Sequence, residues 1–261
     1  MPTKSFIIIV SLLSVACNNT NSAGQTIKTN AQSSNSITEN PFETIQDIPL
    51  PQGFARTKQK ENSYAYYLQH LKLKKDKTVY TFNGSIKQNQ SAQFAVVDIT
   101  VGYKDLQQCA DAVMRLRAEY LFAQKRFTEI DFIDNNRKHY NFTPPYTQTH
   151  FENYLQQVFG MCGSASLAKQ LKPVDVFANM QIGDVIIKGG FPGHAVHVID
   201  MAQNNNGEKI YLLAQSYMPA QNIHVLVNNN DDDLSPWYNV NSNNEIITPE
   251  YSFVKNDLKR W

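Results

Sequence analysis

Four short apolar runs in the second half of this chain constrain its fold more than any other feature. The runs have the length of strands and are rich in branched side chains, at 185–188, 194–200, 210–215 and 223–227. The segments that join them contain Gly, Asn and Pro, the residues of tight turns. Consecutive strands joined by such turns pair in antiparallel order. The second half is therefore predicted to form an antiparallel sheet.

Helical patterns dominate the region before these runs, among a few short strands. A segment opened by Asp105 carries apolar side chains at steps of three and four, namely Leu106, Cys109, Val113, Leu116 and Tyr120. Cys109 lies on the buried face of this helix, where a free thiol packs as a small hydrophobic group. A second helix is predicted around 151–158, and a short third helix is capped by Ser164 and packs on the sheet. Helices followed by strands indicate the α+β class.

The start of the chain has the pattern of an export signal. Lys4 precedes an apolar run at 6–15, and this run is too short to cross a bilayer, which requires roughly 20 residues. Small residues then lead to Cys17, which predicts a lipoprotein signal over 1–17 and acylation of Cys17. An ordinary signal peptide is the alternative. We expect a protein of the cell envelope, anchored to the membrane by lipid.

Residues 18–40 are almost wholly small and polar, and this composition predicts a flexible tether. The remaining chain, 41–261, has no internal repeat and no second linker, so it is predicted to be a single α+β domain whose C-terminal half begins near residue 150. The net charge of +1 and the lack of a basic cluster argue against a nucleic-acid partner. His194 and His197 would face opposite sides of a strand. We therefore expect neither a metal nor a cofactor.

Cys162, His194 and Gln215 are the residues predicted to carry covalent chemistry. A thiol nucleophile needs a base within hydrogen-bond reach and a third group that orients the base. Cys162 lies just before the helix at Ser164, and a helix N-terminus favours the thiolate. His194 begins one predicted strand as the base, and Gln215 ends the next as the orienting group. Backbone N–H groups near Ser164 would contribute to an oxyanion hole.

A second set of residues is predicted to bind the substrate. The run after Gln215 carries polar and aromatic side chains, which would line a cleft beside His194. The predicted binding residues are Ser164, Phe191, Ser216, Tyr217 and Trp237. Ser216 is also the reserve orienting group. Two alternatives stay open: these side chains are ordinary packing, and Cys162 is a core residue or is bonded to Cys109.

The region from Cys162 onward resembles the papain-like thiol amidases of the NlpC and CHAP types. In those families the catalytic histidine stands at a Gly-His strand start after a Gly-Asp turn, as His194 follows Gly183–Asp184 here. Their third residue is a polar group on the next strand, which corresponds to Gln215. The resemblance implies hydrolysis or transfer of an amide, such as one in cell-wall peptide. The rival hypothesis is a non-catalytic envelope protein that binds peptide or glycan in the same cleft.

The whole domain, from about 48 to 253, resembles an uncharacterised family of Bacteroidetes lipoproteins, the domain of unknown function 4846. The resemblance rests on five strings, which are PQGF at Pro51, DLQQCADAVMRLRAEY at Asp105, PGHA at Pro192, LLAQSYMPAQ at Leu212 and SPWY at Ser235. It implies an envelope lipoprotein and assigns no activity.

Overall fold

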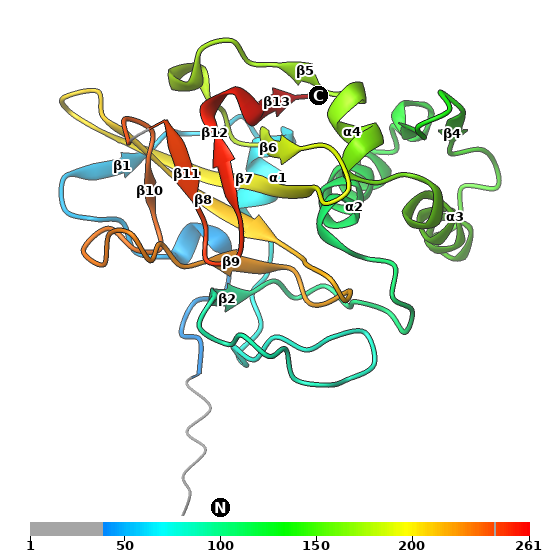
Figure 1. The fold of residues 1–261 in the computed structure, drawn as a ribbon, viewed down its shortest axis with the longest axis horizontal. Coiled ribbons are helices and arrows are strands. Elements are labelled where there is room, and N and C mark those ends of the chain that lie inside the picture. The colour runs from blue at the N-terminus through cyan, green and yellow to red at the C-terminus, as the bar shows by residue number, and fades with distance from the viewer. Residues whose placement is uncertain (1–38, 243) are drawn as a thin grey trace, which may run out of the picture. The chain divides into compact units, whose positions relative to one another are not determined.

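A long strand, β7 (His194–Asn204), runs through the middle of the protein in a computed structural model, which describes residues 39–242 and 244–261 (Figure 1). On one side β7 pairs with β6 (Val185–Lys188), and on the other with β8 (Lys209–Gln215), in antiparallel register. The predicted meander is thus present, with β7 longer than expected. The predicted signal, Cys17 and nearly all of the predicted tether lie outside the described residues.

Within the described residues, nine strands form one antiparallel sheet in the order β2-β9-β8-β7-β6-β13-β5, with β1 added on β7 and β10 on β8. The remaining bounds in this sheet are β1 Phe54–Arg56, β2 Gln93–Val96, β5 Lys172–Pro173, β9 His224–Leu226, β10 Tyr238–Asn239 and β13 Leu258–Arg260. Two hairpins lie outside it, β3 (Asp131–Ile133) with β4 (His139–Asn141), and β11 (Glu245–Ile247) with β12 (Ser252–Val254). The protein is therefore a sheet-rich α+β structure.

The helices are α1 (Tyr64–Gln69), α2 (Cys109–Ala123), α3 (Gln148–Met161) and α4 (Ser164–Gln170), with 3-10 turns at Ile45–Asp47, Phe127–Glu129, Phe177–Asn179 and Lys255–Asp257. Helices α2, α3 and α4 lie together beside the sheet (Figure 1). No helix among the residues that the structure describes is long and apolar enough to cross a membrane.

Helix α2 begins at Cys109 with Gln108 as its cap, three residues later than the sequence pattern predicts. The reason lies at Asp105, whose Oδ1 atom accepts a hydrogen bond from the backbone N–H of Ala220 at 2.7 Å. Asp105 thereby fixes the segment before α2 to the loop after β8 instead of capping a helix. This shift moves Cys109 from the first turn of a longer helix to the first residue of α2. There a thiol lies beside backbone N–H groups that have no intrahelical partner.

Side chains of β7 alternate between separate hydrophobic cores, as the period of a strand requires. Ala195 belongs to the core formed with α2, α3 and α4. Ile199 belongs to a second core with the short helix α1 and the start of the domain. Val196 and Val198 pack on the other side, in the core that includes residues of β11 and β12. The sheet is therefore covered on both faces, and the N-terminal end of β7 lies between the two layers.

Candidate functional site

His194 and Gln215 form a buried hydrogen-bonded pair where β7 begins and β8 ends. The Nε2 atom of His194 lies 2.7 Å from Oε1 of Gln215. Backbone pairing between the two strands starts only at His197 and Ala214, so the side-chain bond joins their ends beyond that register. Burial lowers the pKa of His194 from 6.5 to about 4, while the bond to Gln215 acts in the opposite direction. The imidazole is therefore neutral at pH 7.

Gln215 also contacts a buried ion pair. Its Nε2 atom donates to Oε2 of Glu250 at 2.7 Å, and Nζ of Lys87 lies 2.8 Å from the same oxygen. The imidazole of His224 lies on the same side of the amide, with its Nε2 atom 3.4 Å from Nε2 of Gln215. Lys87 is only 7% exposed, and burial lowers its pKa while Glu250 raises it. The predicted pair of His194 and Gln215 is thus part of a longer polar chain.

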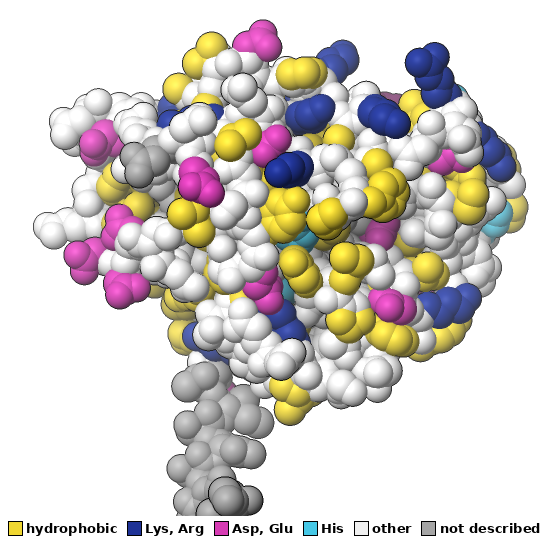
Figure 2. Space-filling view, in the orientation of Figure 1, with side chains coloured by type: hydrophobic (Ala, Val, Ile, Leu, Met, Phe, Trp, Pro, Cys, Tyr) yellow, Lys and Arg dark blue, Asp and Glu magenta, His cyan; other side chains and the backbone are white. Residues whose placement is uncertain are grey.

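Three aromatic rings enclose the imidazole of His194. The ring of Tyr217 meets it edge-on with centroids 4.8 Å apart, and the rings of Tyr251 and Phe253 lie at 5.1 and 5.8 Å. Such packing keeps water away from the bond between His194 and Gln215 and so strengthens that bond. Hydrophobic side chains gather over the middle of the face shown in Figure 2, with histidine atoms visible between them.

Cys109 lies against the backbone of β7, next to the first residue of this pair. It is the first residue of α2, and the backbone N–H groups of Cys109 itself, Ala110 and Ala195 act on its thiol. Ala195 directly follows His194 in β7. A hydrogen bond also joins the segment before α2 to the end of β8, because the Ser216 hydroxyl donates to the backbone carbonyl of Gln107 at 2.9 Å. The sequence pattern predicts a buried Cys109, and the structure confirms this, since the free thiol belongs to the core with α2, α3 and α4. The pattern gave no sign of its contact with Ala195.

The Cys109 thiol is protonated in this resting arrangement. Burial raises its pKa to about 11, and Asp111 acts in the same direction, while the backbone hydrogen bonds oppose this rise. Within the described residues no hydrogen bond joins the thiol to the imidazole of His194, and Cys109 is 7% exposed. The thiol and the imidazole are therefore both neutral, and they form no ion pair with each other.

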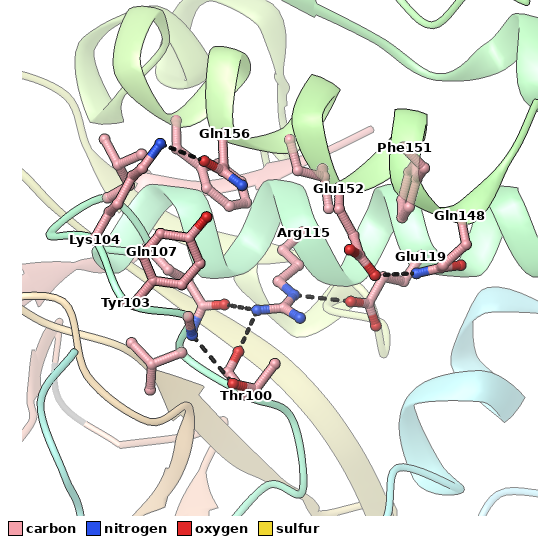
Figure 3. Close-up of a pocket in the computed structure, with 15 residues that line it drawn as sticks. Thr100, Tyr103, Lys104, Gln107, Arg115, Glu119, Gln148, Phe151, Glu152 and Gln156 are labelled. Carbon is pink, nitrogen blue, oxygen red and sulfur yellow. Dashed lines mark hydrogen bonds and ion pairs between the residues drawn. The ribbon is translucent and has the colours of Figure 1, made fainter. Parts of the chain in front are cut away.

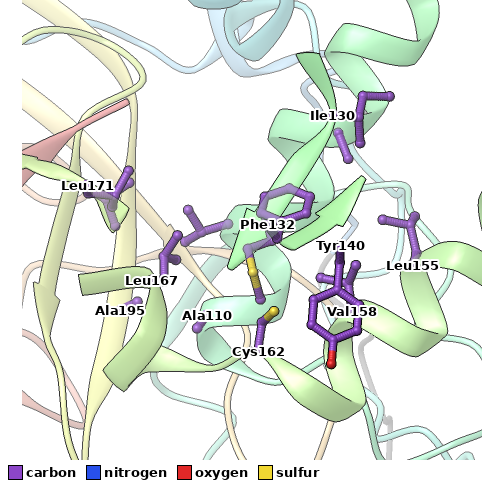
Figure 4. Packing of buried hydrophobic residues seen from close by; sticks show 14 of the residues in the cluster. Ala110, Ile130, Phe132, Tyr140, Leu155, Val158, Cys162, Leu167, Leu171 and Ala195 are labelled. Carbon is purple, nitrogen blue, oxygen red and sulfur yellow. The ribbon is translucent and has the colours of Figure 1, made fainter. Parts of the chain in front are cut away.

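Cys162 lies just before α4, as the sequence predicts, and its thiol is buried, which was the alternative left open. It ends α3 as its C-terminal cap, and its thiol packs in the core with Leu155, Val158 and Leu167 (Figure 4). Burial raises its pKa to about 12, with the nearby Asp134 acting in the same direction. Both Cys109 and Cys162 are free thiols, so the alternative of a disulfide between them is not realised. The α4 N-terminus is capped by Gly163, one residue before the predicted Ser164.

The predicted substrate-binding residues separate into three groups. Tyr217 lies against His194, and Phe191 is 89% exposed in the loop before it. Ser164 contacts that loop through a hydrogen bond from its hydroxyl to the carbonyl of Gly190. Ser216 and Trp237 differ from the prediction, because both are buried. Trp237 donates from its indole to the carbonyl of Pro49, and the hydroxyl of Ser216 bonds only backbone groups, those of Gln107 and Gln221.

A cavity of about 300 Å³ lies beside the start of α2, between α2, α3 and the 100–107 segment (Figure 3). Its wall combines apolar side chains such as Leu106, Phe151 and Leu155 with the guanidinium of Arg115. Arg115 bonds Glu119 at 2.8 Å and also contacts the side chain of Gln107. No sequence signal pointed to this cavity. Gln107, which lies two residues before Cys109 in the chain, is among its lining residues.

In the part of the chain that the structure describes, no group of three or more His, Cys, Asp or Glu side chains is placed to hold a metal ion. Comparison with family models gives one match, to the domain of unknown function 4846, over residues 45–147 and 134–260. The chain belongs to this family. No curated protein matches its sequence, and no solved structure matches its fold.

Proposed function

We propose that this protein is a thiol amide hydrolase or transferase with a papain-like arrangement of its site. Cys109 is the nucleophile, His194 the base and Gln215 the group that orients the base. One observation carries the proposal: the Cys109 thiol, at the N-terminus of α2, lies against the backbone N–H of the residue that follows His194. The bond of 2.7 Å between His194 and Gln215 supplies the remaining pair. Cys109 thus replaces Cys162 in the predicted role.

The chemistry follows from the two neutral groups. The imidazole of His194 takes the thiol proton as the sulfur of Cys109 bonds to the carbonyl carbon of the amide. The carbonyl oxygen gains negative charge, which backbone N–H groups at the start of α2 are able to stabilise. The C–N bond then breaks, and the departing amine takes the proton from the imidazolium. Water or a second amine next attacks the thioester and regenerates the thiol.

The substrate class we propose is an amide of cell-wall peptide or of a similar envelope molecule. The support is the exposed apolar surface near the site, which includes Phe191 before His194 and Met218 after Gln215, exposed by 89% and 55%. The cavity beside Leu106 offers space for an apolar side chain of such a substrate. Peptides are bound by surfaces of this mixed apolar and polar character.

Acyl transfer to Cys109 tests the proposal with a simple probe, 4-nitrophenyl acetate, at about pH 7.5, where the imidazole is neutral. We expect release of 4-nitrophenol and an acetyl group on Cys109, located by mass spectrometry of the digested protein. Cys109→Ser is expected to abolish the acetylation, and His194→Ala to slow it by about 100-fold or more, the usual contribution of a general base. Cys162→Ser is the matched control, because that thiol is equally buried but lies at the C-terminal end of α3 instead of at the start of α2.

Acetylation of Cys109 at no more than the rate of Cys162 in the folded protein would exclude the thiol mechanism. A second function is then favoured by a specific observation, the burial of Cys109 that raises its thiol pKa to about 11. In that case the same surface would bind peptide or glycan without chemistry. Calorimetric titration with purified cell-wall peptide, compared between the native protein and Tyr217→Ala, measures this binding directly.

We also propose that the protein is anchored in the cell envelope by lipid on Cys17, with residues 18–40 as the tether. The support is the short apolar run at 6–15, followed by small residues and Cys17. Metabolic labelling with a palmitate analogue is expected to mark the full chain and to fail in Cys17→Ala. Equal labelling of both proteins would contradict lipid attachment at this residue.

A further inference from the structure

The side chain of Gln215 is held between groups that leave its amide only one orientation. Gln215 is 1% exposed, and all its polar contacts are with protein. One end of the amide meets His194, and the other meets His224 and Glu250. The chemical character of the last two decides which end is the oxygen.

His224 can only accept a hydrogen bond from Gln215. Its Nδ1 atom lies 2.9 Å from the carbonyl oxygen of Asn222, and a carbonyl only accepts, so Nδ1 carries the proton. The imidazole is fully buried, and burial lowers its pKa to about 3, with Lys87 acting in the same direction. A neutral ring with its proton on Nδ1 has a lone pair on Nε2, the atom that faces Gln215.

Glu250 is the second acceptor. Its Oε2 atom takes the bond from Gln215 at 2.7 Å and lies 2.8 Å from the ammonium of Lys87. A carboxylate paired with an ammonium group has no proton to donate. Turning the amide of Gln215 over would place its oxygen against this carboxylate and against the lone pair of His224. The amide oxygen must therefore face His194.

We propose that Glu250 is a positioning residue, which acts through Gln215 to hold His194 in the tautomer with its proton on Nε2 and its lone pair on Nδ1. The amide oxygen only accepts, so the Nε2 atom that it meets at 2.7 Å must donate. Within the described residues Nδ1 of His194 makes no hydrogen bond. It is also not one of the fully buried side-chain atoms that lack a hydrogen-bond partner, so it keeps some exposure to solvent. Nδ1 is thus the atom left free to take a proton.

The tautomer follows from the contacts alone, and its catalytic meaning rests on the proposed function. In the other tautomer Nδ1 would carry a proton, and it would have no lone pair with which to accept the thiol proton of Cys109. Glu250 comes from the turn between β11 and β12, and it lies 35 residues from Gln215 in the chain. The same carboxylate accepts a hydrogen bond from the ammonium group of Lys87, which lies 163 residues away in the chain.

Nitrogen-detected NMR of the histidine rings tests the inference without any substrate. In the native protein His194 is expected to show its proton on Nε2, protected from solvent exchange. Glu250→Met removes the acceptor, and we expect the population of the Nδ1-protonated tautomer to rise by about tenfold or more, since charge-assisted hydrogen bonds are the strong ones. Glu250→Gln keeps an acceptor oxygen and is expected to restore part of the original ratio.

Two further variants keep the test decisive. If Glu250→Met alone fails to fold, the double variant Lys87→Met with Glu250→Met replaces it. The double variant removes both charges and leaves no buried ammonium group unpaired. Glu245→Met is the matched control, because that carboxylate is exposed on β11. A native His194 with its proton on Nδ1, or an unchanged ratio in the double variant, would overturn the inference. A changed ratio in a protein without acyl transfer would uphold the inference and refute only the proposed enzyme.

Discussion

Acidification should destabilise this protein through the buried imidazole of His194. The folded state holds His194 at 2% exposure, where burial lowers its pKa from 6.5 to about 4. Above pH 6.5 the imidazole is neutral in both states, so it makes no pH-dependent contribution. Below that value the unfolded chain binds a proton that the folded protein does not bind. Stability is therefore lost as the pH falls from about 6.5 toward 4.

The size of this loss follows from the two pKa values. At about pH 5 the unfolded imidazole is almost fully protonated and the folded one almost fully neutral. Linkage then gives a loss of about 2 kcal/mol in the free energy of unfolding relative to about pH 8. Other groups titrate in the same range, including Asp111, whose pKa burial raises. Comparing the loss of unfolding free energy between two proteins that share all those groups cancels the contribution of those groups.

The assay is urea unfolding of the native protein and of His194→Gln, each at about pH 8 and pH 5. The native protein is expected to lose about 2 kcal/mol more than the variant on acidification. His139→Gln is the control, because the side chain of His139 is 54% exposed, and it should reproduce the native loss. Equal losses in the native protein and His194→Gln would refute a neutral buried His194 and, with it, the base in the proposed mechanism.

Two other predictions concern the framework that holds the site. Arg56 pairs at 2.7 Å with the fully buried Asp200, so Arg56→Met should lower the unfolding free energy by about 3–5 kcal/mol, and adding Asp200→Asn should recover part of the loss. Urea unfolding measures both, and a loss below about 1 kcal/mol would contradict the pair's role. A Cβ at Gly193 would lie 2.6 Å from the carbonyl oxygen of Gly190, so Gly193→Ala should cost about 2 kcal/mol or more. Gly160→Ala, where the new Cβ lies in the last turn of α3 and meets nothing within 4 Å, should melt no lower than the native protein, and equal melting of both variants would contradict this packing.

The sequence alone determined the elements that depend on local patterns. Strand-length apolar runs separated by turn residues located β6, β7, β8 and β9, because a strand that is buried on both faces must be continuously apolar. The same pattern placed His194 at the start of one strand and Gln215 at the end of the next. Neighbouring strands of a meander bring such ends together, and the structure confirms the contact between them.

Only the tertiary structure decided which cysteine lies against β7, at the residue that follows His194. Both Cys109 and Cys162 lie at a helix end, and a helical pattern fixes the face of a residue more reliably than the residue at which the helix begins. That start was set by the bond from Ala220 to Asp105, which joins segments 115 residues apart. Long-range packing likewise turned Trp237 into a core residue, since its indole found a carbonyl partner at Pro49, 188 residues away. Contacts of this kind depend on how the helices and strands pack once they have formed, so a local sequence pattern does not predict them.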